Sequence, residues 1–415
     1  MVPKGWSSVQ AQDVCKSISV GVVIKPTQYY VPEGYGVKAF RSANVREGFI
    51  NDSDWVYFSH EGHAINKKSH LKTGDVLIVR TGYPGTACVV TPEFEDSNAI
   101  DIVIARPDMD KIIPEYLCAY TNSHIGKSQV LDLQGGMAQK HLNVGAYQVL
   151  KINLPPLREQ KKIAQILSTW DKAISVTEKL LTNSQQQKKA LMQQLLTGKK
   201  RLLDENGERF SGEWKVVRLK QLLHEEKIRN KDNRVQRVLS VTNHSGFVLP
   251  EEQFSKRVAS EDVSTYKIVK KNQYGYNPSR LNVGSFARLD TYDEGVLSPM
   301  YVVFSIYNER LNSDYFLNWM SSNEAKQRIA GSTQGSVRDS VGFDALCSFS
   351  FSLPALAEQK RIAAVLSAAD AEISTLEKKL ACLKDEKKAL MQQLLTGKRR
   401  VSVPVKVEEK EAVSA

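Results

Sequence analysis

A 46-residue segment that occurs twice constrains the fold of this chain more than any other feature. The two copies, residues 154–199 and 353–398, align without a gap at an offset of 199 residues, and 28 of their positions are identical. The last twelve residues of each copy, KKALMQQLLTGK, are the same. Repetition at a fixed offset is typical of a duplicated architecture. We therefore expect two equivalent globular regions with two matching connectors.

Each copy carries the heptad pattern of a long helix in a coiled coil. Seam positions follow one another at spacings of four and three residues, which is the period of such a seam. A helix of about 40 residues would be about 60 Å long. The expected seam consists of Ile163, Leu167, Trp170, Ile174, Thr177, Leu181, Ser184, Lys188, Leu191 and Leu195 in the first copy, and of Ile362, Leu366, Ala369, Ile373, Leu376, Leu380, Leu383, Lys387, Leu390 and Leu394 in the second.

The two seams differ in a way that favours packing of one helix against the other. The large Trp170 in the first copy corresponds to the small Ala369 in the second. The connectivity favours an antiparallel pair, because each globular region then joins neighbouring helix ends. Lys188 and Lys387 place a polar residue in both seams. They either fix the register or extend along the seam edge to solvent, and the sequence leaves both interpretations open.

The ends of the repeated helices are marked as well. Prolines precede each helix, and Gly198 and Gly397 suit the left-handed residue that closes a helix. The basic clusters at 199–201 and 398–400 are expected to stabilise the helix C-termini electrostatically.

The two globular regions share a weak common pattern. Apolar strands are expected at 99–107 and 297–306, helices at 112–130 and 311–329, and Gln-Gly turns at 134–135 and 334–335. Residues 24–68, however, have no counterpart in 225–263. Divergent loops on a shared frame suit two different recognition surfaces.

The predicted fold class is α/β (α+β): two domains with twisted mixed sheets, separated by two long helices that form an antiparallel coiled coil with a pseudo-twofold repeat. The expected boundaries are 1–153, 154–199, 200–352, 353–398 and a disordered tail at 399–415.

Composition limits the function classes. A chain of 415 residues is too long for one ordinary core. The net charge of +11 suits a polyanionic partner, although a basic soluble protein without such a partner also fits it. Five scattered cysteines without a CxxC pair indicate reduced thiols. The sequence shows neither a signal peptide nor a membrane span, so we expect a cytoplasmic protein.

The segments LPPLREQKKIAQIL and LPALAEQKRIAAVL, each leading to KKALMQQLLTGK, resemble the conserved helical regions of the specificity subunit of type I restriction-modification systems. The resemblance covers nearly the whole chain. It implies two target-recognition domains held by an antiparallel coiled coil, in a non-catalytic subunit that reads double-stranded DNA. It also implies two adenine-N6 methyltransferase subunits as partners, which use S-adenosylmethionine, and restriction/translocase subunits, which use ATP and Mg. No cofactor is expected in this chain.

Candidate DNA-binding residues are polar or aromatic side chains in loop-rich stretches. Arginine commonly reads guanine and asparagine adenine, while lysine and arginine contact phosphate. The candidates are Tyr35, Lys38, Arg41, Ser42, Arg46, Arg80, Thr81 and Tyr83 in the first region, and Arg234, Arg237, Asn243, His244, Tyr276, Asn277, Ser279, Arg280, Arg288 and Arg338 in the second. For any one of them, a structural role is the more common alternative. Partner contacts are expected at Gln193, Gln194, Gln392 and Gln393, in the identical ends of the repeat.

Three partial motifs do not support catalysis or metal binding. Asn277-Pro278-Ser279-Arg280 lacks the aromatic fourth residue of adenine-N6 methylases, and Gly198-Lys199 lacks the phosphate-loop frame. His60-Glu61-Gly62-His63 is one residue short of the HExxH zinc motif. We therefore expect no catalytic residue and no metal. The alternatives are a coiled-coil adaptor that binds proteins, or an orphan enzyme.

Overall fold

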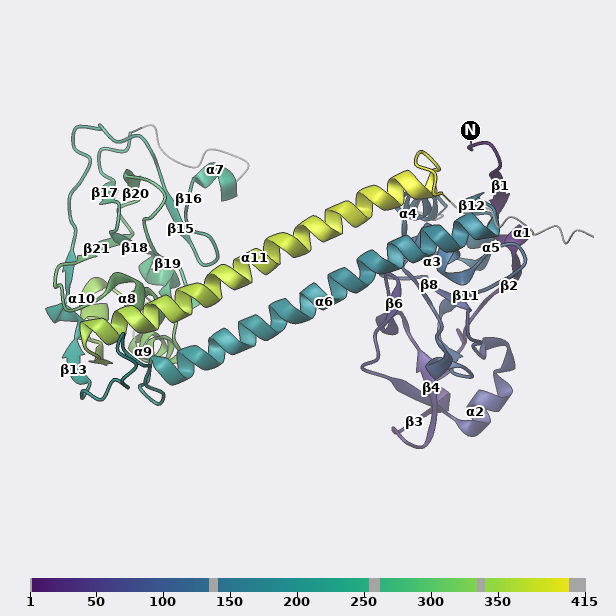
Figure 1. The fold of residues 1–415 in the computed structure, drawn as a ribbon, viewed down its shortest axis with the longest axis horizontal. Coiled ribbons are helices and arrows are strands. Elements are labelled where there is room, and N and C mark those ends of the chain that lie inside the picture. The colour runs from purple at the N-terminus through teal and green to yellow at the C-terminus, as the bar shows by residue number, and fades with distance from the viewer. Residues whose placement is uncertain (1, 134–140, 254–261, 334–339, 403–415) are drawn as a thin grey trace, which may run out of the picture. The chain divides into compact units, whose positions relative to one another are not determined.

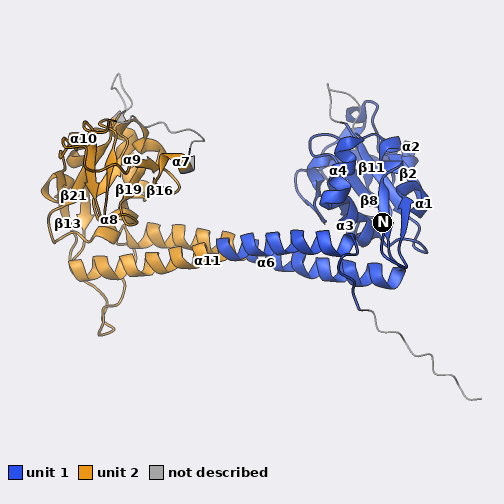
Figure 2. Cartoon of the chain, turned by 90° about the horizontal axis from the view of Figure 1, so that it is seen from above, with its two compact units in different colours: residues 1–179, 377–415 blue, residues 180–376 orange. Residues whose placement is uncertain are grey.

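The computed structural model describes residues 2–133, 141–253, 262–333 and 340–402. The predicted turns at 134–135 and 334–335, the candidate Arg338 and residues 403–415 of the predicted tail lie outside this part. The chain divides into two compact units: unit 1 contains residues 1–179 and 377–415, and unit 2 contains residues 180–376 (Figure 2). Each unit therefore combines one globular region with parts of both long helices.

The two repeated segments form long unbroken helices, α6 (Leu157–Leu195) and α11 (Leu356–Leu395). They lie side by side within each unit (Figure 1). In unit 1 the start of α6 packs with the end of α11, and Ile163 and Leu394 share one core. In unit 2 the end of α6 packs with the start of α11, so the pairing is antiparallel in both. All the expected seam positions are buried or half-buried.

The two seam lysines form equivalent ion pairs. Lys387 pairs with Asp171 in unit 1, and Lys188 pairs with Asp370 in unit 2. The two aspartates occupy the same position of the repeat, and each pair joins α6 to α11. Both lysine side chains are mostly buried, at 18% and 22% exposed. These contacts favour the interpretation that the lysines fix the register.

Unit 1 is built around a four-stranded antiparallel sheet in the order β2-β11-β8-β9. A second four-stranded sheet, β10-β4-β7-β3, is mixed, because β10 pairs parallel to β4. The pairs β1-β12 and β5-β6 complete the strands. The bounds are β1 (Ser7–Gln10), β2 (Cys15–Val20), β3 (Tyr30–Val31), β4 (Gly36–Phe40), β5 (Val45–Arg46), β6 (Phe49–Ile50), β7 (Val56–Ser59), β8 (Val76–Val79), β9 (Ala87–Val89), β10 (Asn98–Ala99), β11 (Ile102–Pro107) and β12 (Lys151–Leu154).

The helices of unit 1 outside the two long ones are short and lie between the strands along the chain. They are α1 (Ala11–Val14), α2 (His60–Ile65), α3 (Pro114–Asn122), α4 (His124–Asp132) and α5 (Val144–Gln148), with 3-10 turns η1 (Pro26–Tyr29), η2 (Ser42–Asn44), η3 (Lys67–Ser69) and η4 (Pro92–Phe94).

The central strand β8 of unit 1 is apolar throughout because both of its faces are buried. Successive side chains of a strand point to opposite faces. Val76 and Ile78 therefore join the core under α3, with Tyr116. Leu77 and Val79 join a second core on the other face, which includes Phe40, Val45 and Phe94. The sheet thus lies between the helical layer and the outer loops.

Unit 2 repeats the main four-stranded antiparallel sheet, but its described residues form no second four-stranded sheet. Its main sheet has the order β14-β21-β18-β19, and its pairs are β13-β22, β15-β16 and β17-β20. The bounds are β13 (Lys215–Arg218), β14 (Leu223–Glu225), β15 (Ser240–Thr242), β16 (Gly246–Val248), β17 (Lys267–Lys270), β18 (Tyr274–Tyr276), β19 (Phe286–Arg288), β20 (Glu294–Leu297), β21 (Val302–Ile306) and β22 (Ser350–Leu353), with α7 (Pro250–Gln253), α8 (Ser313–Met320), α9 (Asn323–Thr333), α10 (Phe343–Ser348), η5 (Leu219–Gln221) and η6 (Pro278–Val283).

The helices expected at 112–130 and 311–329 are each interrupted. In unit 1 the break falls at Ser123, whose Oγ accepts from the Gly126 amide and so caps a new helix, α4. A serine cap accepts from an amide in the first turn of the new helix, which has no acceptor within that helix. In unit 2 the corresponding break separates α8 from α9. Among the described helices, none combines the length and apolar character required to cross a bilayer.

Candidate nucleic-acid interface

A glutamate in the first turn of α6 anchors unit 1. Its carboxylate, on Glu159, accepts a hydrogen bond of 2.9 Å from the Trp6 indole and two from Arg400, of 2.7 and 2.9 Å. Burial alone would raise the pKa of Glu159, but the hydrogen bonds from Arg400 and Trp6 outweigh it and hold the pKa below its usual value. Arg400 lies five residues beyond the end of α11, so the cluster joins three segments that are far apart in the sequence.

Unit 2 contains the same anchor in the equivalent position of the repeat. Glu358 accepts a hydrogen bond of 3.0 Å from the Trp214 indole and two from Arg201, of 2.5 and 2.8 Å. Here the arginine follows the end of α6. The basic residues that sequence analysis assigned to the helix ends therefore act, in the case of Arg201 and Arg400, through a carboxylate on the other long helix.

The glutamine that follows each anchoring glutamate fixes the loop that precedes α3 in unit 1 and α8 in unit 2. Gln160 is fully buried, donates to the carbonyls of Lys111 and Pro155 at 2.9 Å each, and accepts from the Ile113 amide at 3.0 Å. Gln359 makes the corresponding bonds in unit 2, to the carbonyls of Arg310 and Pro354 and from the amide of Asn312. Sequence analysis missed these residues, although the Glu-Gln pair is identical in both copies.

Four of the candidate DNA-binding residues in unit 1 are well exposed. Tyr35 precedes β4 and is 72% exposed, and Tyr83, in the turn between β8 and β9, is 83% exposed. Arg46 and Thr81 are exposed as well. Large aromatic side chains left in solvent are available for stacking or groove contacts.

Other candidates in unit 1 already have partners. Lys38 lies 2.9 Å from Asp52 and above the ring of Trp55, with 4.8 Å between its Nζ and the ring centroid. Arg41 pairs with Asp54 at 3.3 Å. Ser42 is half-buried at the start of η2. Any DNA contact by Lys38 or Arg41 must therefore compete with a carboxylate.

Arg80, another candidate for DNA binding, has a structural position. Its side chain is buried, its Nε donates to the Leu142 carbonyl at 3.0 Å, and its guanidinium contacts Asp101 and His141. These contacts tie the end of β8 to the segment before α5. Few of its donors remain for a ligand.

The accessible candidates of unit 2 gather on two adjacent loops. Asn243 and His244 are exposed in the turn between β15 and β16, and Ser279 and Arg280 are exposed on η6. The Ser285 hydroxyl donates to the Val241 carbonyl at 2.8 Å and so links the two loops.

Asn277 is half-buried and has a local structural role. Its side chain accepts from the Ser279 amide at 3.0 Å and caps η6. This contact gives the Asn-Pro-Ser-Arg segment a structural explanation. Within the described residues, no carboxylate lies within ion-pair distance of Arg280. Arg280 therefore offers a guanidinium that no carboxylate of the described residues holds in place.

The remaining candidates of unit 2 are paired or buried. Arg234 pairs with Glu294 at 2.8 Å, and Arg237 lies over the Tyr292 ring. Burial would lower the pKa of Arg288, but hydrogen bonds to two aspartates raise it. Tyr276 is fully buried in the core, so its side chain offers no surface to a ligand in this structure.

The glutamines expected to contact partners are exposed at the ends of the long helices. Gln392 and Gln393 lie in unit 1, and Gln193 and Gln194 lie in unit 2. In unit 1 a cavity of about 660 Å³ is lined by α3, α6 and the β5–β6 region, together with Lys387 and Met391 of α11. Both of these residues belong to the same identical ending as the glutamines.

The chain resembles known proteins over most of its length. Residues 3–183 and 211–384 match the family described as the type I restriction modification DNA specificity domain. The putative type I restriction enzyme MjaX specificity subunit of Methanocaldococcus jannaschii is 26% identical, over 96% of this chain and 95% of that protein. The MjaVIII specificity subunit of the same organism is 25% identical, over 96% and 94%.

Solved structures share the fold. The S subunit of the type I restriction-modification system from M. genitalium has a TM-score of 0.59 at 12% identity, over 95% of this chain and 96% of that chain. A second chain, from a structure concerned with complex assembly and conformational transition of the type I R-M system, has a TM-score of 0.56 at 16% identity, over 96% and 100%. At such identities the likeness shows a common architecture.

Proposed function

Because the chain belongs to the family of type I restriction-modification specificity subunits, we propose that it reads an asymmetric bipartite DNA site without catalysing a reaction itself. Each unit reads one half-site, and the bases between the half-sites are not read. The chain holds two adenine-N6 methyltransferase subunits and, through them, restriction/translocase subunits. S-adenosylmethionine, ATP and Mg then act in those partners.

The observation that carries this proposal is that one anchoring scheme supports two different outer regions. The Trp-Glu-Arg and glutamine contacts recur in both units, while residues 24–68 and 225–263 share no common pattern. Identical frames with different loops suit two readers of different sequence. The exposed Tyr35 of unit 1 and Asn243 of unit 2 lie in these differing regions, and the exposed Tyr83 and Arg280 lie on turns outside them.

The first experiment maps N6-methyladenine in cells with and without the gene, which identifies both half-sites and their spacing. Binding to that DNA is then measured with the assembled methyltransferase complex over a range of salt concentrations. Arg280→Ala should weaken specific binding about tenfold or more, since one good base contact contributes about 1–3 kcal/mol. Arg209→Ala, an exposed arginine of unit 2 outside the two loops, is the control and should stay within about twofold. Equal effects of the two variants would contradict the assignment of the loops.

A second experiment tests whether the helices set the spacer. The ion pairs lie 17 residues apart on both helices, from 171 to 188 and from 370 to 387. Deleting residues 175–181 and 377–383 removes one heptad from each helix between these pairs and preserves the seam. The deletion shortens each helix by about 10 Å, equivalent to about three base pairs. The preferred spacer should shorten or binding should be lost; an unchanged spacer would refute the idea.

A third measurement addresses catalysis. The purified chain alone should not transfer a methyl group from S-adenosylmethionine to DNA, and transfer by the chain alone would refute the non-catalytic assignment.

A further inference from the structure

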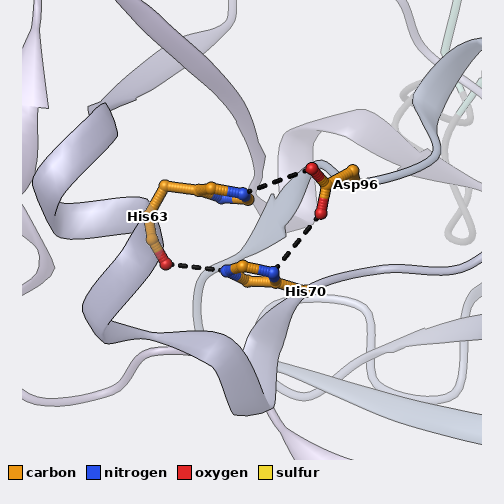
Figure 3. Close-up of side chains that lie close together, drawn as sticks. All are labelled: His63, His70 and Asp96. Atoms are coloured by element: carbon orange, nitrogen blue, oxygen red, sulfur yellow. Dashed lines mark hydrogen bonds and ion pairs between the residues drawn. The ribbon is translucent and has the colours of Figure 1, made fainter.

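Two histidines and an aspartate of unit 1 bring three metal-ligand atoms together (Figure 3). His63 lies on α2, His70 follows η3, and Asp96 follows η4. The His63 Nε2 atom is 3.5 Å from one carboxylate oxygen of Asp96, and the His70 Nδ1 atom is 3.3 Å from the other. All three ligand atoms lie within 4.8 Å of one another. The ligands thus come from three separate segments that the fold places side by side.

The hydrogen bond on the far side of His70 fixes which nitrogen carries its proton. The Nε2 atom lies 2.7 Å from the backbone carbonyl oxygen of His63. A carbonyl only accepts, so Nε2 carries the hydrogen and donates it. In the neutral ring, Nδ1 therefore presents a lone pair toward Asp96. Metal-bound histidines are commonly oriented in this way by their second nitrogen.

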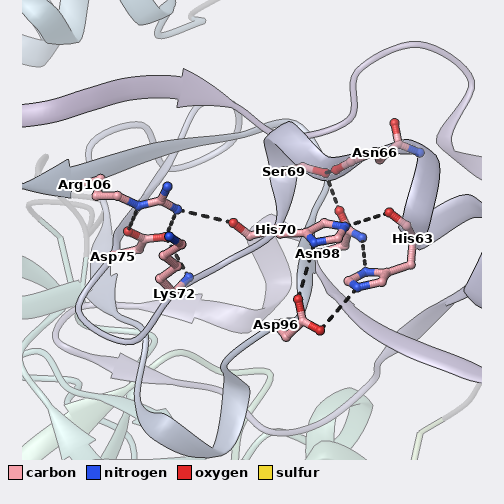
Figure 4. A network of polar contacts seen from close by, with 9 residues as sticks. All are labelled: His63, Asn66, Ser69, His70, Lys72, Asp75, Asp96, Asn98 and Arg106. Carbon is pink, nitrogen blue, oxygen red and sulfur yellow. Dashed lines mark hydrogen bonds and ion pairs between the residues drawn. The ribbon is translucent and has the colours of Figure 1, made fainter.

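A chain of polar contacts orients His63 (Figure 4). Ser69 has one hydroxyl hydrogen, and its oxygen lies 2.8 Å from the Asn66 carbonyl, which can only accept. The side-chain amide of Asn98 turns its oxygen toward Ser69 and its nitrogen toward His63 Nδ1, 2.6 Å away, so Nδ1 accepts and Nε2 carries the hydrogen that faces Asp96. A half-turn of the amide exchanges its nitrogen and oxygen. Nδ1 then donates, and Nε2 presents its lone pair toward Asp96, as metal binding requires.

The cluster has one open side. The His63 and His70 side chains are 12% and 24% exposed, whereas Asp96 is 73% exposed. The open side of the cluster thus faces solvent, where water can complete a coordination shell.

The distances to Asp96 are longer than those of direct ion pairs, and the three ligand atoms, which lie within 4.8 Å of one another, must draw closer to hold a small ion. Charge-assisted contacts between nitrogen and oxygen are usually about 2.7–2.9 Å long, shorter than the 3.3 and 3.5 Å found here. Ligands bound to Zn²⁺ at about 2.0–2.1 Å in tetrahedral geometry lie about 3.3 Å apart. Imidazole nitrogen and carboxylate oxygen are both ordinary zinc ligands.

We propose that His63 Nε2, His70 Nδ1 and the Asp96 carboxylate form a binding site for Zn²⁺, with water as the fourth ligand. The two rings stack at 3.7 Å with an angle of 7° between their planes. A metal lies near the plane of each ring that binds it, so entry of the ion turns the stacked rings apart. The more exposed His70 has more room for this rotation.

A bound ion would brace part of the recognition surface of unit 1. The ion would join the α2–η3 segment to Asp96, which lies between η4 and β10. The first residue of β10, Asn98, pairs with Ala39 of β4. The next residue back along β4 is Lys38, a candidate for DNA binding. Sequence analysis expected no metal because it compared spacing within one helix, whereas these ligands belong to three segments. The inference does not depend on DNA reading.

The test uses the untagged full chain after treatment with EDTA. Zn²⁺ alone is titrated in competition with a chromophoric chelator, and one equivalent should bind tightly. Asp96→Asn and His70→Gln should each weaken that binding at least tenfold. His60→Gln, an exposed histidine on α2, is the matched control and should bind as the original chain does. Asp96 is exposed, so its substitution leaves the fold intact, which circular dichroism verifies.

Cobalt(II) provides a readout of the ligand geometry. The Co²⁺-loaded chain should show the strong visible absorption of a tetrahedral site, and Asp96→Asn should reduce it, with His60→Gln unaffected. The absence of bound zinc, or equal binding by the Asp96→Asn and original chains, would overturn the proposal. Loss of binding in His60→Gln alone would overturn it as well, because the ion would then lie elsewhere.

Discussion

Arg400→Ala tests the anchor of unit 1, and the hydrogen bonds that it removes set the expected loss of stability. The substitution removes two of the three side-chain hydrogen bonds to Glu159, whose side chain is 6% exposed, and leaves the Trp6 indole and the Val401 backbone as donors. A hydrogen bond to a charged group contributes about 1.5–3 kcal/mol. Arg400 itself is 46% exposed, so solvent screens part of each interaction. We expect a loss of about 2–3 kcal/mol in the free energy of opening unit 1.

Hydrogen exchange measured by mass spectrometry resolves which unit opens. A loss of about 2–3 kcal/mol corresponds to exchange about 30- to 150-fold faster. This acceleration should appear in the first turns of α6 and in β1, and it should leave the amides of unit 2 unchanged. Arg201→Ala should do the reverse, since it removes the equivalent bonds to Glu358 in unit 2.

Lys398→Ala is the matched control for Arg400→Ala. Lys398 is exposed two residues earlier in the chain, and its loss should cost less than about 0.5 kcal/mol. The reasoning fails if the two variants exchange alike, or if Arg400→Ala accelerates both units equally.

Three further outcomes follow from the same contacts. Gln359→Ala leaves the Asn312 amide and two carbonyls without their partner, so unit 2 should lose about 2–4 kcal/mol in urea unfolding, whereas exposed Lys360→Ala should cost under about 0.5 kcal/mol. Asp370→Asn removes the half-exposed ion pair with Lys188 and should cost at most about 1 kcal/mol, less in high salt; a loss above about 2 kcal/mol would contradict this estimate. The lowered pKa of Glu159 gives stability that is complete above its unfolded pKa of about 4.3 and is lost as the pH falls through the lower folded value. Glu159→Gln should therefore flatten the acid limb of the thermal stability profile, and an unchanged limb would count against it.

The sequence predicted the features that depend on local periodicity. A heptad pattern reports which side of a helix is apolar, so it predicted both long helices and the burial of positions such as Ile163 and Leu366. The breaks at Ser123 and between α8 and α9 were not predicted, because one capping side chain ended a pattern that was otherwise helical. Helix ends that are set by single hydrogen bonds do not change the apolar periodicity of the sequence, so the pattern does not predict them.

The candidate DNA residues show a different limit. Side-chain chemistry identified arginines and tyrosines that suit DNA, but burial depends on segments distant in the sequence. Arg80 is held by Leu142 and His141, about 60 residues away. Tyr276 lies in the core formed by β18 and its neighbouring strands. Residue type therefore predicted the chemistry of the surface, while the fold decides which side chains remain on it.

The anchors explain why the repeated segment has to be repeated. Glu159 in the first copy is paired with Arg400, after the end of the second copy, and Glu358 in the second copy is paired with Arg201, after the end of the first. Each unit therefore needs the beginning of one copy and the end of the other, and neither copy satisfies its own buried glutamate. A buried carboxylate without its partner is costly, so a change in one copy at these positions requires a matching change in the other. The outer residues 24–68 and 225–263 carry no such constraint, which leaves the recognition surfaces free to differ while the helices and their anchors stay the same.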